Sequence, residues 1–271
     1  MAETEKNIIN DDIKCVMLDL DGTVYLGSRL FDFTIDFLNR LDRIGIGHIF
    51  LTNNSSLSAN DYLEKFKRLG IRTTIDNILT SGHASADYIN NSEYKGKRVF
   101  VMGSKSLKRE LCEHGINVCE DNPDLLLAAF DTELTFDTLT KFTNYVADGY
   151  HYIATHPDNV CPNENGFWPD LGSFIELIHA CTGRYPEKIC GKPSEQILVA
   201  AEHKTGLKRQ NLLMVGDRLS TDIAIGRHGV PTALVLSGES KVEDIPTAEV
   251  KPTYVFNSIR ELGFALENKS M

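Results

Sequence analysis

The sequence lacks two features that would place the protein on a membrane or on nucleic acid. No run of apolar residues approaches the length of a membrane span, and the polar start, residues 1–12, lacks the apolar core of a signal peptide. Basic residues are also outnumbered, with 28 Lys and Arg against 38 Asp and Glu, which gives a formal net charge of −10. Because nucleic-acid binders carry a basic surface, we expect a cytoplasmic protein whose partners are neither nucleic acid nor membrane.

Cysteine and histidine patterns typical of zinc sites and of disulfides are absent as well. The six cysteines form no Cys-x-x-Cys pair, and the eight histidines show no i, i+4 spacing of the zinc-binding type. Cys15, Cys181 and Cys190 lie in or beside apolar segments, so we expect small buried hydrophobic residues there. A reducing cytoplasm fits this cysteine usage.

The chain also has no internal repeat, no low-complexity tract and no linker rich in Pro or Gly. What it has is an alternation of strand-like apolar runs with helix-length amphipathic segments, which is typical of an α/β fold with a mainly parallel, Rossmann-like sheet. No Gly-x-Gly-x-x-Gly follows the first strand, which argues against a nucleotide-binding oxidoreductase. The expected strands of this sheet are 14–20, 47–52, 187–190, 211–215 and 232–236, and the expected helices are 31–44, 58–69, 81–91, 193–205, 219–228 and 257–266.

The most informative motif is Asp19-Leu20-Asp21-Gly22-Thr23, which follows the apolar run 15–18. Side chains two residues apart on a strand share a face, so the two carboxylates are expected at the same end of the strand. One carboxylate can attack an electrophile while the other moves a proton, and a divalent ion can hold both near a phosphate. The same five residues also suit a strand that ends in an ordinary Asp-Gly turn.

Three further polar motifs each follow an apolar run. They are Thr52-Asn53-Asn54-Ser55, Gly191-Lys192-Pro193, and Gly216-Asp217 with a second acid at Asp222. Loops that follow parallel strands meet at the carboxyl edge of the sheet, where open α/β sheets bind ligands. Together the four loops offer carboxylates, a hydroxyl, amides and an ammonium, which suit a metal and a phosphate bound together.

Each of these motifs also has a structural interpretation. Residues 52–55 suit a helix N-cap before 58–69, and a single lysine such as Lys192 is usually a solvated surface residue. Gly216-Asp217 suits an ordinary turn, and Asp222 suits the first turn of a helix, where the helix dipole favours an acid. The order of all four, each after a strand, favours the functional interpretation.

With these motifs in place, the chain resembles the haloacid dehalogenase-like phosphohydrolases, in their type IIA branch of NagD-like and p-nitrophenyl phosphatase-like enzymes. The resemblance covers nearly the whole chain from about residue 13 onward. Segments that carry it are 21–27 (Asp-Gly-Thr-Val-Tyr-Leu-Gly), 51–56 (Leu-Thr-Asn-Asn-Ser-Ser), 191–194 (Gly-Lys-Pro-Ser) and 216–224 (Gly-Asp-Arg-Leu-Ser-Thr-Asp-Ile-Ala).

A second set of elements, without any of the four motifs, occupies the middle of the chain. Its expected elements are strands 98–102, 124–130 and 150–154 and helices 104–114 and 136–148. The resemblance implies that this stretch is an inserted α/β cap domain at 82–184, and that 1–81 with 185–271 forms a discontinuous catalytic core.

The resemblance also implies roles for the catalytic and phosphate-binding residues. Asp19 would be the nucleophile that forms an aspartyl-phosphate, and Asp21 would be the general acid and base. Thr52, through its hydroxyl, and Asn53, through its amide, would bind phosphoryl oxygens. Lys192 would offset negative charge between Asp19 and the phosphoryl group.

The implied cofactor is Mg²⁺. By resemblance, its ligands would be the Asp19 carboxylate, the backbone carbonyl of Asp21 and the Asp217 carboxylate. Asp222 would act from the second shell or through a water molecule. These are hard oxygen ligands of the kind that Mg²⁺ prefers.

Residues 155–171 form an expected irregular segment, which is long for a compact domain. Relatives usually have Asn before its Pro-Asp, whereas this chain has His156 followed by Pro157 and Asp158. We therefore consider His156 and Asp158 as candidates for substrate discrimination. An ordinary connection packed on the cap is the alternative.

The presence of the second acid, Asp21, favours hydrolysis or transfer of a phosphate ester over dehalogenation. The implied activity is a Mg²⁺-dependent phosphatase for small phosphate monoesters such as sugar phosphates. Two alternatives stay open: a phosphotransferase or phosphomutase that uses the same intermediate, and a non-catalytic phosphometabolite-binding protein. Homodimerisation is common among relatives and is expected on that ground alone.

Overall fold

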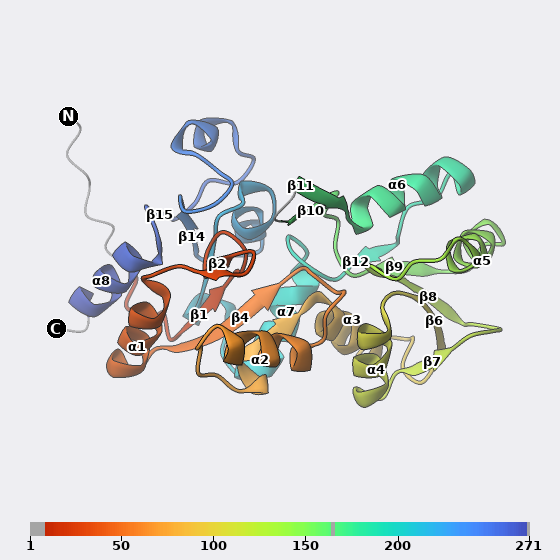
Figure 1. The fold of residues 1–271 in the computed structure, drawn as a ribbon, viewed down its shortest axis with the longest axis horizontal. Coiled ribbons are helices and arrows are strands. Elements are labelled where there is room, and N and C mark those ends of the chain that lie inside the picture. The colour runs from red at the N-terminus through yellow and green to blue at the C-terminus, as the bar shows by residue number, and fades with distance from the viewer. Residues whose placement is uncertain (1–8, 164–165, 270–271) are drawn as a thin grey trace. The chain divides into compact units, whose positions relative to one another are not determined.

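The protein is described from a computed structural model, in which residues 9–163 and 166–269 are placed. The chain packs as two compact units (Figure 1). The first unit comprises Met1–Leu51, Phe66–Asn77 and Glu202–Met271, and the second comprises Thr52–Lys65 and Ile78–Ala201. The domain boundaries implied by the resemblance, at 82 and 184, stay a prediction.

Parallel strands and helices alternate along most of the described chain. The strands are β1 (Cys15–Leu18), β2 (Tyr25–Leu26), β3 (Arg29–Leu30), β4 (Gly47–Thr52), β5 (Ile78–Thr80), β6 (Arg98–Met102), β7 (Asn117–Cys119), β8 (Leu125–Ala128), β9 (Tyr152–Ala154), β10 (Val160–Asn163), β11 (Gly166–Pro169), β12 (Lys188–Ile189), β13 (Leu212–Gly216), β14 (Thr232–Val235) and β15 (Tyr254–Phe256). The α-helices are α1 (Thr34–Ile44), α2 (Ala59–Arg68), α3 (Ser81–Asn90), α4 (Lys105–Glu113), α5 (Phe136–Ala147), α6 (Leu171–Thr182), α7 (Glu195–Thr205) and α8 (Ile259–Lys269).

The larger sheet has the strand order β15-β14-β13-β1-β4-β5. Strand β1 pairs in parallel with β4 on one side, where Leu18 lies opposite Phe50, and with β13 on the other, where Leu18 lies opposite Val215. All four residues of β1 are buried, as expected for the central strand of a parallel sheet. The chain runs outward from β1 to one edge and later returns on its other side, so the β1–β13 boundary is a topological switch point.

Helices α1 and α8 pack against each other in the first unit (Figure 1). Each buries one apolar face, which contributes Phe37, Leu38 and Leu41 from α1 and Ile259, Leu262 and Leu266 from α8. Gly263 permits the close approach, because a Cβ atom there would lie 3.0 Å from the ring of Phe37. The two amphipathic helices therefore form a single packed pair.

The second unit has its own parallel sheet, with the strand order β12-β9-β8-β6-β7. Helices α5 and α6 pack together on one face of this sheet, and α3 and α4 pack together on the other (Figure 1). Alternate strand residues enter the α5–α6 core, whose buried members are Phe100, Met102, Leu126, Ala128, Phe142, Val146, Tyr152, Ala154, Leu171, Ile175 and Ile178.

Most of the expected elements are confirmed, and the α/β architecture with mainly parallel sheets is correct. The expectation of an α-helix at 219–228 was wrong, because two other kinds of helical turn form there. Leu219–Ile223 forms a π-helical turn and Ala224–His228 a 3₁₀ turn. The Arg218 carbonyl accepts the backbone N–H groups of both Asp222 and Ile223, at 3.0 and 3.1 Å, which widens the turn. Such π turns are frequent at functional sites.

Two other expectations are corrected. The segment 155–171 is not irregular throughout, because β10 and β11 form an antiparallel hairpin within it. Proline is tolerated in such a ribbon, because each strand of a two-stranded ribbon has an edge that needs no backbone donor. Strand β12 is the expected strand near 187–190, yet it pairs with β9 in the second sheet. Helix α6 was not expected from the sequence at all.

Among the described residues, no helix is both long enough and apolar enough to span a membrane. Cys15 and Cys190 are buried as expected, and burial raises the pKa of each thiol to about 12. Cys181 is exposed, so the expectation of burial was wrong for this residue. It lies in the last turn of α6, away from the buried residues Leu171, Ile175 and Ile178 of the same helix.

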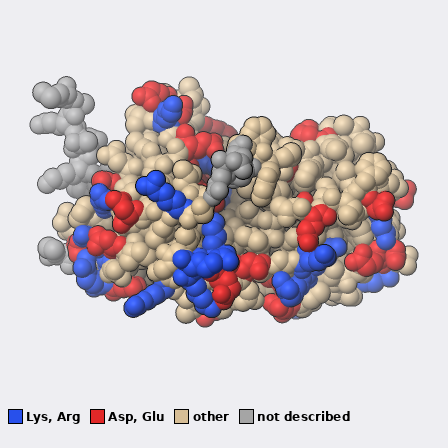
Figure 2. All heavy atoms as spheres, in the orientation of Figure 1, with Lys and Arg blue, Asp and Glu red and all other residues tan. Residues whose placement is uncertain are grey.

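Charges of both signs are mixed on the surface. The face drawn in Figure 2 carries basic and acidic side chains among a larger area of uncharged residues, and neither sign covers it alone.

His48, near the start of β4, is expected to make the stability of the protein depend on pH. Its Nε2 atom is buried and has no hydrogen-bond partner among the described residues, and its ring contacts Phe50 edge-on with centroids 5.3 Å apart. Burial lowers the pKa of His48, an effect that the nearby Asp42 carboxylate partly opposes. The folded protein therefore binds this proton more weakly than the unfolded chain does.

Because the folded pKa is lowered, the protein loses stability as the pH falls through the unfolded histidine value of about 6.5. We expect His48→Phe to reduce the loss in unfolding free energy between pH 7.5 and pH 5.5, measured by urea denaturation. His203→Gln, at an exposed histidine of the same unit, serves as the control. An identical pH dependence in His48→Phe and in the wild type would contradict the prediction.

Candidate active site

Two acidic residues follow the neighbouring strands β1 and β13 at the topological switch point. Asp19 comes directly after β1, and Asp217 directly after β13. The Asp19 N–H donates to the Val215 carbonyl at 2.8 Å, which extends the ladder of the two strands by one residue. The sheet register therefore delivers both acids to the same edge, as the sequence predicted.

Asp222 joins these two acids from the π-helical turn. One carboxylate oxygen of each residue, Asp19, Asp217 and Asp222, lies within 4.8 Å of the others. Asp222 accepts the Arg218 N–H at 3.0 Å and is only 1% exposed. Gly216 leaves room for it, since a Cβ atom there would lie 2.3 Å from the Asp222 carboxylate. We refer to Asp19, Asp217 and Asp222 as the acidic cluster.

Glycines surround the carboxylate of Asp217, which is 3% exposed. A Cβ atom at Gly22 would lie 2.4 Å from its Oδ2 atom, and one at Gly238 would lie 2.0 Å from the same atom. The Glu239 N–H donates to Oδ2 at 2.7 Å. Gly22 also has a φ of +88°, so it is required for both its conformation and its lack of a side chain.

Sequence reasoning missed the loop after β14, although a signal for it was present. Ser237, Gly238 and Glu239 follow a predicted strand, as the four motifs do, but carry no obvious chemistry. In the structure the Ser237 hydroxyl donates to the Gly22 carbonyl at 2.7 Å. Gly238 and Glu239 contact Asp217, so this loop shapes the acidic cluster.

The chemistry of the acidic cluster suits a hard divalent cation. Three carboxylates this close repel one another, and two of them are buried, so a cation or a bound proton must relieve the repulsion. Carboxylate oxygens are the ligands that Mg²⁺ and Ca²⁺ prefer. The residues therefore fit a divalent metal by charge, atom type and proximity.

The carboxylate of Asp21 lies outside this cluster. Its side chain is exposed and accepts the Gly27 N–H at 3.3 Å. Its backbone forms an isolated bridge with Tyr25, and the Gly22 N–H donates to the Tyr25 carbonyl at 2.8 Å. The turn after Asp19 thus separates the two acids of the motif, one toward the other carboxylates and one toward solvent.

The second unit holds the other predicted residues, Thr52, Asn53 and Lys192. All three are buried, with exposures of 6%, 6% and 2%. The Thr52 hydroxyl accepts the Asn54 N–H at 3.2 Å, which shapes the turn after β4. The Lys192 N–H donates to Oδ1 of Asn53 at 2.8 Å, and Nδ2 of Asn53 donates to the Lys192 carbonyl at 3.0 Å. The structure thus brings two separate motifs together.

His156 and Asp158 lie beside these residues in the same unit. His156 is fully buried, with Nδ1 3.0 Å from the Thr155 hydroxyl and Nε2 2.9 Å from the Asp170 carboxylate. Asp158 is half-buried and accepts an N–H of Asn53 at 3.0 Å. Their role in substrate discrimination stays a prediction.

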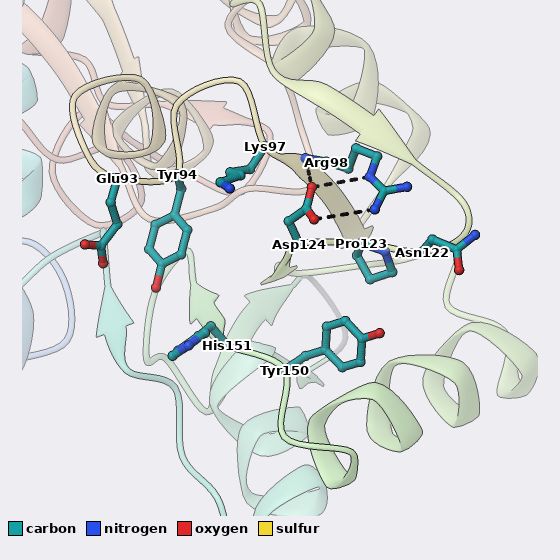
Figure 3. Close-up of a pocket in the computed structure, with 9 residues that line it drawn as sticks. All are labelled: Glu93, Tyr94, Lys97, Arg98, Asn122, Pro123, Asp124, Tyr150 and His151. Atoms are coloured by element: carbon teal, nitrogen blue, oxygen red, sulfur yellow. Dashed lines mark hydrogen bonds and ion pairs between the residues drawn. The ribbon is translucent and has the colours of Figure 1, made fainter.

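A separate hollow of about 670 Å³ lies in the second unit at the opposite edge of its sheet (Figure 3). It is lined at the starts of β6, β8 and β9 by residues that include Arg98, Asp124 and His151. Arg98 is held against the Asp124 carboxylate at 3.3 Å, as the dashed lines in Figure 3 mark. This hollow is at the amino ends of the strands, whereas the predicted residues follow their carboxyl ends.

Comparison with known proteins agrees with this geometry. Residues 16–117 match the family model described as haloacid dehalogenase-like hydrolase, and residues 189–262 match a model described as HAD-hydrolase-like. A protein named acid sugar phosphatase from Staphylococcus aureus is 34% identical over 256 residues, which cover 94% of this chain and 98% of that protein.

Solved structures give the same result. The 4-nitrophenylphosphatase from Thermotoga maritima superposes with a TM-score of 0.90 at 38% identity, covering 94% of this chain and 98% of that one. NagD from Escherichia coli K-12 superposes with a TM-score of 0.84 at 32% identity, covering 92% and 98%. The chain therefore belongs to the haloacid dehalogenase-like hydrolases, in the type IIA branch of NagD-like and p-nitrophenyl phosphatase-like phosphoric monoester hydrolases.

Proposed function

We propose that this protein is a Mg²⁺-dependent phosphatase that hydrolyses small phosphate monoesters through an aspartyl-phosphate on Asp19. The observation that carries the proposal is the acidic cluster, in which Asp19 lies with Asp217 and Asp222 within 4.8 Å at the switch point of a parallel sheet. A cation and a carboxylate nucleophile at one point suit attack on a phosphate ester.

The metal would be held by carboxylate oxygens of Asp19 and Asp217 and by the backbone carbonyl of Asp21. Asp222 would act from the second shell or through a water molecule. When bound, Mg²⁺ would neutralise charge on the phosphoryl oxygens and so permit an anionic nucleophile to approach. Only oxygen ligands are involved, which favours Mg²⁺ over softer transition metals.

In the first step, an Asp19 oxygen forms a bond to phosphorus while the bond from phosphorus to the ester oxygen breaks. Asp21 gives its proton to the departing alkoxide. In the second step, Asp21 takes a proton from water, whose oxygen attacks phosphorus and releases inorganic phosphate from Asp19. The exposed carboxylate of Asp21 can exchange protons with solvent between turnovers.

Thr52, Asn53 and Lys192 are proposed to bind the phosphoryl group. The ammonium of Lys192 would compensate the negative charge of Asp19 and of the phosphate oxygens. The side chain of Lys192 is only 2% exposed, and a buried cation is worth more to a phosphate than a solvated one. The hydroxyl of Thr52 supplies a neutral hydrogen bond.

The proposed substrates are sugar phosphates or similar small metabolites. The name of the Staphylococcus aureus relative, acid sugar phosphatase, and that of the Thermotoga maritima structure, 4-nitrophenylphosphatase, support a phosphate monoester with a small leaving group. An inserted domain at 82–184 would restrict access to small molecules. We also propose a cytoplasmic location, and a homodimer by analogy with relatives.

Asp19→Asn should abolish phosphate release, because an amide cannot act as the nucleophile. We expect the turnover number to fall by at least about 10³-fold in an assay with p-nitrophenyl phosphate and Mg²⁺. Asp76→Asn, at an exposed acid outside the acidic cluster, should keep wild-type turnover. Normal turnover in Asp19→Asn would rule out the covalent route.

Asp21→Asn should slow the reaction by roughly 10²–10⁴-fold, the usual contribution of a general acid and base. The deficit should be smaller for p-nitrophenyl phosphate than for a sugar phosphate, since p-nitrophenolate leaves without protonation. Steady-state rates with both esters measure this difference. Full turnover of the sugar phosphate by the variant would refute the assignment of Asp21.

Phosphate release from a panel of small esters should require a divalent metal. We expect activity with Mg²⁺ and none with EDTA, and Asp217→Asn should raise the Mg²⁺ concentration for half-maximal rate by about tenfold or more. The ranking of esters would identify the substrate class. Activity that persists in EDTA would overturn the metal requirement, and ester formation with an added alcohol would favour a phosphotransferase.

A further inference from the structure

The side chain of Asn53 has no N–H donor left for a phosphoryl oxygen. A side-chain amide offers one acceptor oxygen and two N–H donors. In this structure Oδ1 accepts the Lys192 N–H at 2.8 Å, and Nδ2 donates to the Lys192 carbonyl and to the Asp158 carboxylate, both at 3.0 Å. The orientation of the amide is fixed by chemistry, because a backbone N–H can only donate and must face the oxygen.

From this arrangement we propose that the side chain of Asn53 is a clasp that positions Lys192, with Asp158 as its anchor, and that it does not itself bind phosphate. The proposal rests on the phosphatase function proposed above and assigns new roles to two residues of that site. Any contact of Asn53 with a phosphoryl oxygen would then come from its backbone N–H.

The clasp fixes Lys192 from both sides. Its two hydrogen bonds hold the N–H and the carbonyl of one residue, so the peptide planes before and after the Lys192 Cα atom are restrained together. Gly191 makes the approach possible, because a Cβ atom there would lie 2.6 Å from the Asn53 Oδ1 atom. The Gly191 N–H also donates to the Thr155 carbonyl at 2.6 Å, which holds the loop before Lys192.

The anchor is itself held in place. The Asp158 carbonyl accepts the Gly172 N–H at 2.7 Å, and a Cβ atom at Gly172 would lie 2.3 Å from the Pro157 carbonyl oxygen. Two residues earlier, the buried ring of His156 is bonded through both nitrogens, to Thr155 and to Asp170. Asp158 therefore presents its carboxylate from a loop that is fixed on both sides.

The chain of contacts also reaches the loop that contains Asn53. The Ser55 hydroxyl lies 2.9 Å from the Thr155 hydroxyl and accepts the Phe130 N–H at 3.0 Å. The Ser81 hydroxyl donates to the Asn53 carbonyl. All of these groups are buried, and hydrogen-bonded networks in a low-dielectric interior restrict motion. Loss of one member should therefore displace Lys192.

A double-mutant cycle tests the clasp. Asn53→Ala and Asp158→Ala should each lower kcat/KM, the first by as much as about 10²-fold through misplacement of Lys192. Both should also raise the inhibition constant for inorganic phosphate. In the double variant the effects should fall well short of the product of the single effects, because both residues act through one contact.

Asp158→Asn separates the hydrogen bond from the charge. The new amide can still present an oxygen to Nδ2 of Asn53, so we expect kcat/KM within about threefold of the wild type. Asn91→Ala, at an exposed asparagine of the same unit whose side chain donates to Asp87, should leave the kinetics unchanged. Circular dichroism and thermal melting establish that each variant is folded.

If the effects of Asn53→Ala and Asp158→Ala on kcat/KM multiply in full in the double variant, the clasp is overturned. It is also overturned if the inhibition constant for inorganic phosphate rises in Asn53→Ala but not in Asp158→Ala. An equal loss of kcat/KM in Asp158→Asn and Asp158→Ala would overturn the role of Asp158 as anchor, because it would mean that the charge of Asp158 acts on substrate. If the wild type releases no phosphate from any ester, the proposed function fails, and the cycle is then measured by calorimetry of inorganic phosphate binding. The same coupling in that binding constant is expected, and its absence would again overturn the clasp.

Discussion

Mutual repulsion among Asp19, Asp217 and Asp222 is the constraint around which the first unit is built. Unit charges on carboxylate oxygens that lie within 4.8 Å of one another repel by at least about 3 kcal/mol for each pair, if the effective dielectric constant is about 20. The fold holds them together with the strand register, with backbone donors from Arg218 and Glu239, and with glycines on several sides. What the protein cannot supply from its own backbone is a compensating full charge, and this is the part that a divalent cation would provide.

Buried polar groups of the second unit are stabilised differently. Their donors are matched to acceptors, as in the hydrogen bonds of the Asn53 amide with Lys192 and Asp158. An ion contributes at long range and tolerates small displacements, whereas a hydrogen bond weakens steeply with angle. The first unit therefore groups like charges that call for a counter-ion, whereas the second unit pairs a buried amide with matched donors and acceptors.

The sequence predicted those parts of the site that follow a buried strand. The positions of Asp19, Thr52 and Asp217 at the ends of parallel strands were predicted correctly, because an apolar run followed by polar residues is a local pattern with a known place in a parallel sheet, while their roles stay predictions. The position of β12 in the second sheet could not be predicted, since a two-residue strand carries no information about its neighbour. The same limit applies to Asn53, whose residue type suits a helix cap, a phosphate ligand or a clasp until its partners are known.

Other features depended on interactions that no local pattern records. The π-helical turn at Leu219–Ile223 arises because one carbonyl accepts two N–H groups, and an α-helix was the natural expectation for that composition. His156 was noticed only as an unusual residue type, because its burial against Asp170 requires the hairpin and helix α6 to be in place. Exposure of Cys181 likewise follows from which face of α6 meets the core.

Strand order determines when the acidic cluster can form during synthesis. Leu18 pairs with Val215, so the two halves of the acidic cluster come from opposite ends of the chain. During synthesis Asp19 is translated early. Asp217 and Asp222 follow roughly 200 residues later, which takes about 10–40 s at usual elongation rates. An incomplete chain that stops before β13 contains Asp19 without the two other acids of the cluster. The acidic cluster can thus assemble only after the chain has been completed through Asp222, and the loop of Gly238 and Glu239 that contacts Asp217 follows later still.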